Sequence, residues 1–128
     1  MTRQGGLAMR GQYPPEYLEF IRLFNEGRYA ESHEALMEAW SRDHSNRFYK
    51  ALIQMAGALE HWEAASYYWS ENLFRGAREL LEPYRPHHAG LDIDSLVRLL
   101  ETCADVAQAK RKDREGHYKL PPLVLKLD

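Results

Sequence analysis

The side chains best suited to chemistry lie together in the stretch "SHEALMEAW", residues 32–40. His33, Glu34 and Glu38 offer an imidazole and two carboxylates, which serve as metal ligands and as general acids or bases. A zinc peptidase of the H-E-x-x-H type needs a second histidine four residues after the first, so that both rings reach one zinc ion. That position is Met37, a poor zinc ligand, so the spacing argues against this class of enzyme.

On a helix, His33, Met37 and Trp40 share one face, and Glu34 and Glu38 lie on a neighbouring polar flank. We predict that His33 is a buried histidine that holds a hydrogen bond where two helices cross, because buried polar groups need partners. This structural interpretation is favoured over a role as a ligand. We also expect Trp40 to be largely buried against the next helix.

A second set of polar residues lies on the following helix, where Gln54 and His61 are two turns apart. These side chains either meet His33 and Glu34 across a helix pair or are solvated at the rim, and the spacing alone does not choose. If they meet, the alternative function is a small metal-dependent enzyme, with His33, Glu34 and His61 as ligands and Glu38 as the base.

These residues need a scaffold, and the apolar pattern predicts an all-α one. Apolar residues recur at helical spacing in five segments, residues 17–24, 29–40, 48–62, 73–84 and 96–107. We expect Gly27 to end the first helix, Ser45 or Asn46 to cap the third, and Asp94 to cap the last. The polar segment "SEN", residues 70–72, indicates a short break.

We therefore predict a single-domain bundle of about five helices. The second and third helices would be its central antiparallel pair, because short loops force neighbours to pack antiparallel. Residues 1–12 would form a flexible arm, residues 13–112 the helical domain and residues 113–128 an extended tail. Pro121 and Pro122 prevent a helix in the tail, and its apolar "LVLKL" predicts packing on the bundle.

Composition is typical of a soluble globular protein: 128 residues, 45% hydrophobic, 28% charged and a formal net charge of −2. That charge offers no field to attract nucleic acid or an anionic membrane, and no apolar run is long enough to span a bilayer. The single cysteine, Cys103, cannot form an internal disulfide and fits a reducing compartment. We expect a cytoplasmic prokaryotic protein with no cofactor, since it has no glycine-rich phosphate loop.

Aromatic residues crowd the stretch "HWEAASYYWSE". If the third helix continued through it, Trp62, Tyr67, Tyr68 and Trp69 would point in different directions, and one core would not cover them all. Exposed tryptophan and tyrosine are typical of interface centres. We predict that the third helix projects past the bundle here and forms a homodimer. The alternative is that the apolar tail, residues 120–127, folds back over the same rings.

The chain resembles the uncharacterised prokaryotic family called domain of unknown function 309 in three stretches, "FNEGRYAESHEALMEAW", "FYKALIQMAGALEH" and "ENLFRGARELLEPYRPHHAGLDIDSL". The residues that match the family pattern are Gly27, Tyr29, His33, Glu34, Trp40, Ile53, Gln54, His61, Asn72, Gly76 and Ala77. This resemblance implies a compact helical fold with the motif in its interior, and it implies no activity. Two features depart from the pattern: the family's second motif glutamate falls at Met37, one place before Glu38, and a longer turn follows His61.

Three functions remain open from the sequence. The favoured one is a non-enzymatic helical binding or scaffold module for an unidentified ligand or protein partner, with a structural polar cluster around the His-Glu motif. The second is the metal-dependent enzyme described above. The third is a nucleic-acid-associated protein that uses the basic segment "KRKDRE", residues 110–115. Because that segment carries both signs of charge, we favour a solvated helix end there over a nucleic-acid patch.

Overall fold

The computed structural model describes residues 13–128, and the predicted N-terminal arm, residues 1–12, lies outside them. The α helices are α2 (Pro15–Asn25), α3 (Tyr29–Arg42), α4 (Arg47–Glu63), α5 (Tyr67–Leu81) and α6 (Ile93–Lys112). A 3-10 turn, η1 (Glu82–Tyr84), and an antiparallel hairpin of β1 (His87–His88) and β2 (Leu91–Asp92) connect α5 to α6. The predicted all-α class is confirmed for the described part of the chain, with this small hairpin added.

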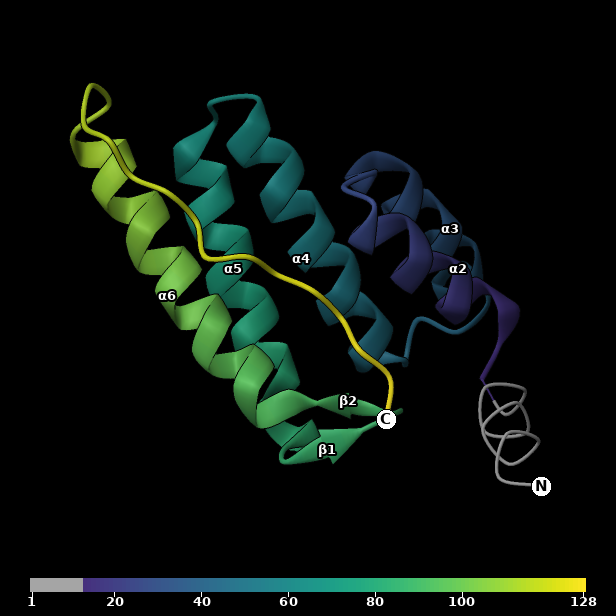
Figure 1. The fold of residues 1–128 in the computed structure, drawn as a ribbon. Helices are drawn as coiled ribbons and strands as arrows, with labels where there is room; N and C mark the ends of the chain where they lie inside the picture. The colour runs from purple at the N-terminus through teal and green to yellow at the C-terminus, as the bar shows by residue number, and fades with distance from the viewer. Residues whose placement is uncertain (1–12) are drawn as a thin grey trace.

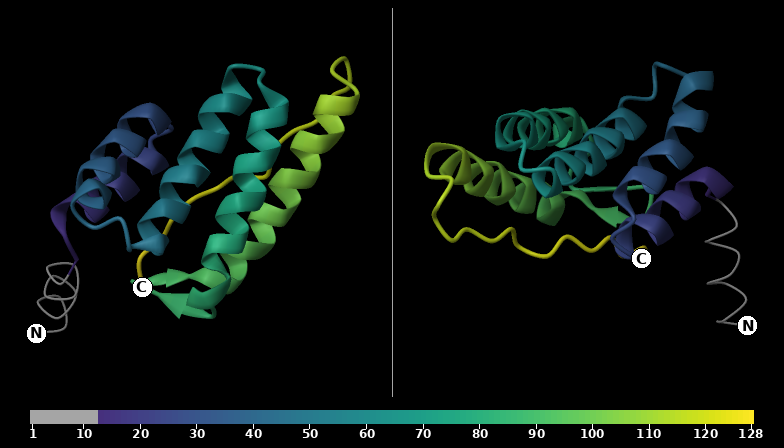
Figure 2. Two further views of the ribbon diagram at one scale, coloured as in Figure 1. Left: turned by 180° about the vertical axis from the view of Figure 1, so that it is seen from behind. Right: turned by 90° about the horizontal axis from the view of Figure 1, so that it is seen from above.

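The helices pack in the order in which they occur in the chain. α2 contacts α3, α3 contacts α4, α4 contacts α5, and α5 contacts α6. Figure 1 shows α4, α5 and α6 side by side, with α2 and α3 at one end, and Figure 2 shows the same order from behind. The most extensive contacts join α4 to α5 and α5 to α6. The prediction that the second and third helices, α3 and α4, form the central pair is therefore wrong in part. Helix α4 is central, but its contact with α5 is more extensive than its contact with α3.

Side-chain caps explain where α4 and α6 begin. The side chain of Asn46 accepts a hydrogen bond from the backbone N–H of Tyr49 at 3.0 Å and so caps α4, as predicted. Asp92 caps α6 by accepting from the backbone N–H of Ser95 at 3.0 Å. The predicted cap at Asp94 is wrong because that residue already lies in the first turn of α6.

The break between α4 and α5 falls at Ala65, not at the predicted "SEN" segment, residues 70–72. Ala65 has φ 59°, a left-handed conformation of the kind that ends helices. Ser70 instead lies buried inside α5, where its hydroxyl donates to the carbonyl of Ala58 at 2.8 Å. The prediction that the third helix continues and projects past the bundle is therefore wrong.

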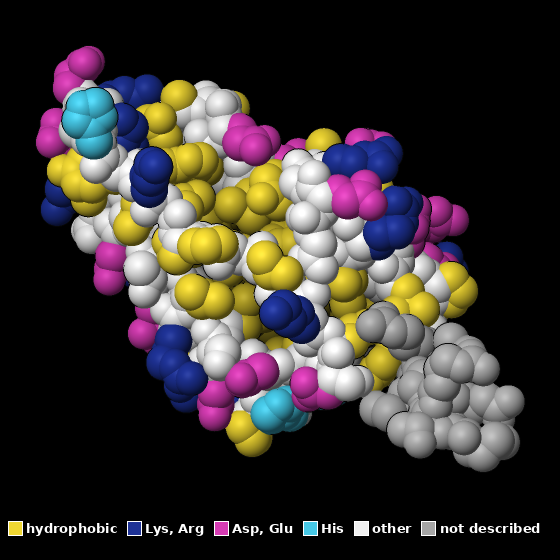
Figure 3. All heavy atoms as spheres, viewed as in Figure 1, with side chains coloured by type: hydrophobic (Ala, Val, Ile, Leu, Met, Phe, Trp, Pro, Cys, Tyr) yellow, Lys and Arg dark blue, Asp and Glu magenta, His cyan; other side chains and the backbone are white. Residues whose placement is uncertain are grey.

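The core is built from one apolar face of each helix and from the tail. Its largest fully buried side chains are Tyr17, Phe20, Phe24, Phe74, Leu36, Leu52, Met55, Leu81, Ile93 and Leu100. The extended tail crosses the helices and returns to the hairpin (Figure 1). It adds Leu123 and Leu125 to the core, and Figure 3 shows hydrophobic side chains gathered over the middle of the face that it crosses. Leu123 and Leu125 of "LVLKL" thus pack on the bundle.

Hydrogen bonds fasten the tail at its end. The Asn25 side chain donates to the carbonyl of Leu125 at 2.8 Å and accepts from the same residue's N–H at 2.9 Å. The N–H of Asp128 donates to the carbonyl of Gly90 at 2.9 Å. Gly90 has φ +79°, and a Cβ there would lie 2.7 Å from the hydroxyl of Tyr13, so this close approach requires glycine.

Candidate functional site

His33 contacts α4, as its spacing predicts, but through a different partner. Its Nδ1 lies 3.0 Å from Oε2 of Glu60. The two side chains are 34% and 32% exposed, so the histidine predicted to be buried is partly solvated. No hydrogen bond within residues 13–128 joins His33 to Gln54 or His61. The His33–Glu60 pair joins α3 to α4 and thereby fixes the two helices against each other.

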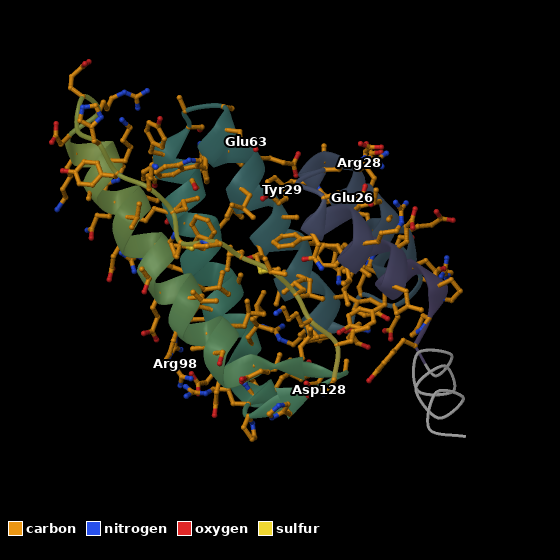
Figure 4. All side chains as sticks on the ribbon, in the orientation of Figure 1. Glu26, Arg28, Tyr29, Glu63, Arg98 and Asp128 are labelled. Atoms are coloured by element: carbon orange, nitrogen blue, oxygen red, sulfur yellow. The ribbon has the colours of Figure 1, made fainter. Side chains whose placement is uncertain are left out.

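Tyr29, one turn before His33, extends this helix contact. Figure 4 shows Tyr29 near Glu63, where α3 begins and α4 ends. Burial raises the pKa of the Tyr29 phenol, and the negative charge of Glu63 adds to the shift. Tyr29 is therefore a neutral side chain at neutral pH. Its ring packs edge-on against Phe24 with 5.2 Å between centroids, so this end of the motif joins α2, α3 and α4.

The rest of the motif faces outward more than its spacing predicts. Glu34 and Glu38 are exposed on the expected polar flank. Met37, predicted on the packed face, is 38% exposed. The buried residues of α3 are Ser32 and Leu36. Because α3 packs against α2 as well as α4, its buried stripe is centred between the two helices, and Met37 falls at the edge of that stripe.

Trp40 is partly buried, between the core residues and the exposed ones. Its ring stacks on His44, with 4.2 Å between centroids, and lies outside the core cluster. The indole N–H is buried and has no acceptor among the described residues. An unpaired buried donor costs about 1–3 kcal/mol. Together with Met37 and Ile53, Trp40 lines a hollow between α3 and α4.

Gln54 lies on α4 against the backbone of α5. A Cβ built on Gly76 would lie 2.5 Å from Oε1 of Gln54, so the carboxamide occupies the space that a side chain at position 76 needs. At the other helical glycine of this helix pair, Gly57, a Cβ would meet only Leu73 at an ordinary 3.5 Å. The Gln54 carboxamide forms no hydrogen bond with another described residue.

Three adjoining hollows form a groove across α3, α4, α5 and α6, which we call the α4 groove. The first, of about 200 Å³, is lined by Met37, Trp40, Lys50, Ile53 and Gln54. The second, of about 260 Å³, is lined by Arg47, Lys50, Gln54, Gly76, Glu79 and Leu80. The third, of about 620 Å³, lies between α5 and α6 and is lined by Asn72, Arg75, Gly76, Arg78, Glu79, Leu100, Glu101 and Ala104. Neighbouring hollows share lining residues, so the three adjoin one another, and no tail residue lines them.

The cations of α4 differ from those of the neighbouring helices. Every arginine on α2, α3 and α5 has a carboxylate within 3.4 Å: these are Arg22, Arg42, Arg75 and Arg78. Arg47 and Lys50 on α4 form no ion pair with any residue that the structure describes. Glu79, across the second hollow, has no charged partner within residues 13–128 either. The floor of the α4 groove thus carries unpaired charges of both signs.

The family model for the domain of unknown function DUF309 matches residues 17–80, half of the chain. The chain belongs to the DUF309 family. No curated protein and no solved structure matches it. The DUF309 segment runs from α2 almost to the end of α5, so it contains the His33–Glu60 pair and the first two hollows of the α4 groove. Helix α6 and the tail lie outside the matched residues.

Two of the four aromatic residues predicted for an interface are covered within the DUF309 chain itself. Trp62 packs edge-on against Tyr67 with 5.1 Å between centroids, and the guanidinium of Arg114 lies 4.9 Å from the centre of the Tyr67 ring. Tyr68 and Trp69 also pack edge to face, but each is 55% exposed. The tail therefore does not cover these two rings.

The basic segment of residues 110–115 holds the DUF309 fold together. The Lys110 ammonium donates to two backbone carbonyls just after α6. Arg111 donates to the buried carboxylate of Glu71 at 2.9 Å, and Arg114 donates to the carbonyl that follows α4 at 3.2 Å. Three of its four cations are thus engaged within the chain.

No group of three His, Cys, Asp or Glu side chains within residues 13–128 is arranged to hold a metal ion. His33, Glu34 and His61 are therefore not brought together as the predicted ligand set. Burial raises the pKa of the Cys103 thiol to about 12, so this thiol stays protonated. None of the described helices combines the length and apolar composition that a membrane crossing requires.

Sequence reasoning missed Glu60, Lys50 and Arg47. One signal was present for the last two, because Arg47, Lys50 and Gln54 follow one another at three- and four-residue steps and so share a stripe of α4. Glu60 precedes His61, and only the rotation of α4 relative to α3 decides which of the two meets His33.

Proposed function

We propose that this DUF309 chain is a non-enzymatic binding module and that its ligand or protein partner binds in the α4 groove. The observation that carries the proposal is the set of unpaired polar side chains on α4. Arg47, Lys50 and Gln54 have no partner among the described residues, although the arginines on α2, α3 and α5 do. A few polar groups beside an apolar hollow are typical of a binding site.

The His33–Glu60 pair has a structural role beside this groove. His33 and Glu60 line none of the three hollows. The histidine–carboxylate pair best placed to exchange a proton therefore lies outside the groove. The pair instead fixes α3 against α4, the two helices that form the apolar end of the groove.

Nuclear magnetic resonance with small organic probes tests the proposal. The isotope-labelled protein is titrated with isopropanol, phenol and acetate, which probe apolar, aromatic and anionic binding. We expect the largest chemical-shift changes at the amides of Lys50, Gln54 and Gly76 and at the indole N–H of Trp40. Shifts spread evenly over the surface, or clustered elsewhere, would contradict a binding role for the groove.

Self-association is a second candidate because Tyr68 and Trp69 are 55% exposed. Two exposed rings packed against each other are typical of an interface centre. If they form a homodimer, light scattering at micromolar concentration will show a dimer that dissociates when both residues are changed to serine. A monomer at that concentration would contradict it. No observation on residues 13–128 favours the metal-dependent or nucleic-acid function, and neither is proposed.

A further inference from the structure

The features of the α4 groove follow a fixed order. An apolar hollow lined by Met37, Trp40 and Ile53 comes first. Lys50 lines both this hollow and the second one, which Arg47 also lines. Glu79 stands where the second hollow joins the third, the long space between α5 and α6. Along the groove, the apolar hollow is therefore followed by two cations, then by a carboxylate, and then by the open channel.

We infer that the α4 groove binds the carboxyl-terminal end of a peptide or protein whose last residue is apolar, an inference that rests on the proposed function. The last side chain occupies the apolar hollow. The terminal carboxylate lies at Lys50 and Arg47. The last peptide N–H points to Glu79, and the preceding residues run along the channel between α5 and α6.

Charge pairing supports a carboxylate at Lys50 and Arg47. These two cations have no carboxylate partner within the described chain, whereas charge-assisted hydrogen bonds to a carboxylate are the strong ones that such cations form. The Gln54 carboxamide beside them supplies a further donor. Capture of a terminal carboxylate by fixed donors is a recurring mode of peptide recognition.

The hollow next to Lys50 suits one apolar side chain. Met37 contributes a flexible thioether that adapts to differently shaped groups, and Trp40 contributes a large ring surface. Its volume of about 200 Å³ is small for a larger ligand. A charged last residue would lose its water there without gaining a partner, because no carboxylate lines this hollow.

The third hollow favours a peptide over a small free acid. Its volume of about 620 Å³ extends the groove well beyond the cations. Its arginines are already neutralised, since Arg78 donates to Glu101 at 2.8 Å and Arg75 lies 3.4 Å from Asp105. A channel whose charges are already paired can hold a peptide main chain of varied sequence. At its entrance, the carboxylate of Glu79 accepts a hydrogen bond from a peptide N–H.

Peptide pools test the inference. The main probe is a pool of N-acetylated tetrapeptides with three randomised residues and a final leucine as the free acid. It is compared with the same pool as the amide, with an acid pool that ends in lysine, and with N-acetyl-leucine. Binding is followed by the shifts of the Lys50 and Gln54 amides and the Trp40 indole N–H. We expect each comparison probe to bind about tenfold more weakly than the main pool.

A charge-removing variant with a matched control sharpens the test. Lys50→Gln is expected to weaken binding of the leucine acid pool about tenfold and to leave the amide pool nearly unchanged. Lys112→Gln is the control, because this exposed lysine lies at the end of α6 and lines none of the three hollows. Circular dichroism checks that both variants remain folded. Equal weakening by both variants would show a general charge effect and overturn the inference.

The remaining outcomes separate the two proposals. If the acid and amide pools change the chemical shifts of the groove residues equally, the carboxylate is not recognised. The inference then fails, but the proposal that the groove binds a ligand remains. If N-acetyl-leucine binds as tightly as the main pool, the ligand is a small acid, and the peptide part fails. If no peptide pool shifts these residues while phenol or acetate does, only the inference fails. If nothing shifts them, both proposals fail.

Discussion

The contact between Gln54 and Gly76 gives a quantitative test of the groove floor. In Gly76→Ala, the new Cβ would lie 2.5 Å from Oε1 of Gln54, so the carboxamide must move. Ala stabilises a helix interior by about 1 kcal/mol relative to Gly. Forcing the Gln54 side chain from its rotamer costs about 0.5–1.5 kcal/mol. The two effects oppose each other, so the free energy of unfolding is expected to change by less than about 1 kcal/mol.

A double-mutant cycle separates the two effects. In a Gln54→Ala background the clash is absent, so Gly76→Ala should then raise the free energy of unfolding by the full helix-propensity gain of about 1 kcal/mol. The difference between the two backgrounds is the coupling energy, and we expect it to be about 1 kcal/mol. Urea denaturation followed by far-ultraviolet circular dichroism measures all four variants.

Gly57→Ala is the matched control. Gly57 is also helical, but its Cβ would lie at an ordinary 3.5 Å from Leu73. This change should stabilise the protein by about 1 kcal/mol whether or not Gln54 is present. The reasoning is refuted if Gly76→Ala is as stabilising as Gly57→Ala with Gln54 intact, because Gln54 then does not lie across α5.

Three further changes test the contacts that hold the bundle. Asn25→Ala removes two hydrogen bonds to the backbone of Leu125 and should lower the free energy of unfolding by about 1–2 kcal/mol; amide exchange at Leu125 should also accelerate, and unchanged exchange would contradict the role of Asn25 as a clamp. Glu71→Ala leaves two arginines without their buried carboxylate and should cost about 2–4 kcal/mol in urea denaturation; a near-neutral effect would show that solvent already screens this network. Burial raises the pKa of the Cys103 thiol to about 12, which disfavours the thiolate below that pH; the native protein should therefore resist a thiol reagent at pH ~8 and react fully in urea, where the thiol regains its usual pKa of about 8.5. Rapid labelling of the native protein would show that Cys103 is accessible.

The helices were predictable because each carries a local signal. Apolar residues at helical spacing marked every helix face, and Asn46 marked the start of α4. The tail was predictable for a similar reason, since two prolines exclude a helix and the apolar residues that follow them need cover. In each case the deciding residues lie within one element.

The break after α4 was misplaced because its deciding contacts come from other elements. Ser70 and Asn72 resemble turn residues in a local window. In the fold, Ser70 donates to a carbonyl of α4, and Glu71 pairs with Arg75 of α5 and Arg111 of α6. These partners satisfy the polar side chains inside α5. The turn forms earlier, at Ala65. A glycine would have indicated the left-handed backbone there, but an alanine gives no such signal in the sequence.

The candidate site was predicted in part, for the same physical reason. Helical spacing placed His33 toward α4, but the choice of Glu60 over its neighbour His61 depends on how α4 is rotated, and one residue changes the direction of a side chain by 100°. Whether Lys50 is paired is even harder to predict from neighbouring residues. It depends on which carboxylates the fold brings near Lys50 and on which other cations those carboxylates already pair with. Glu101 of α6, for example, pairs with Arg78 of α5. A residue pattern identifies a cation, but only the assembled helices show whether that cation is left free to bind a ligand.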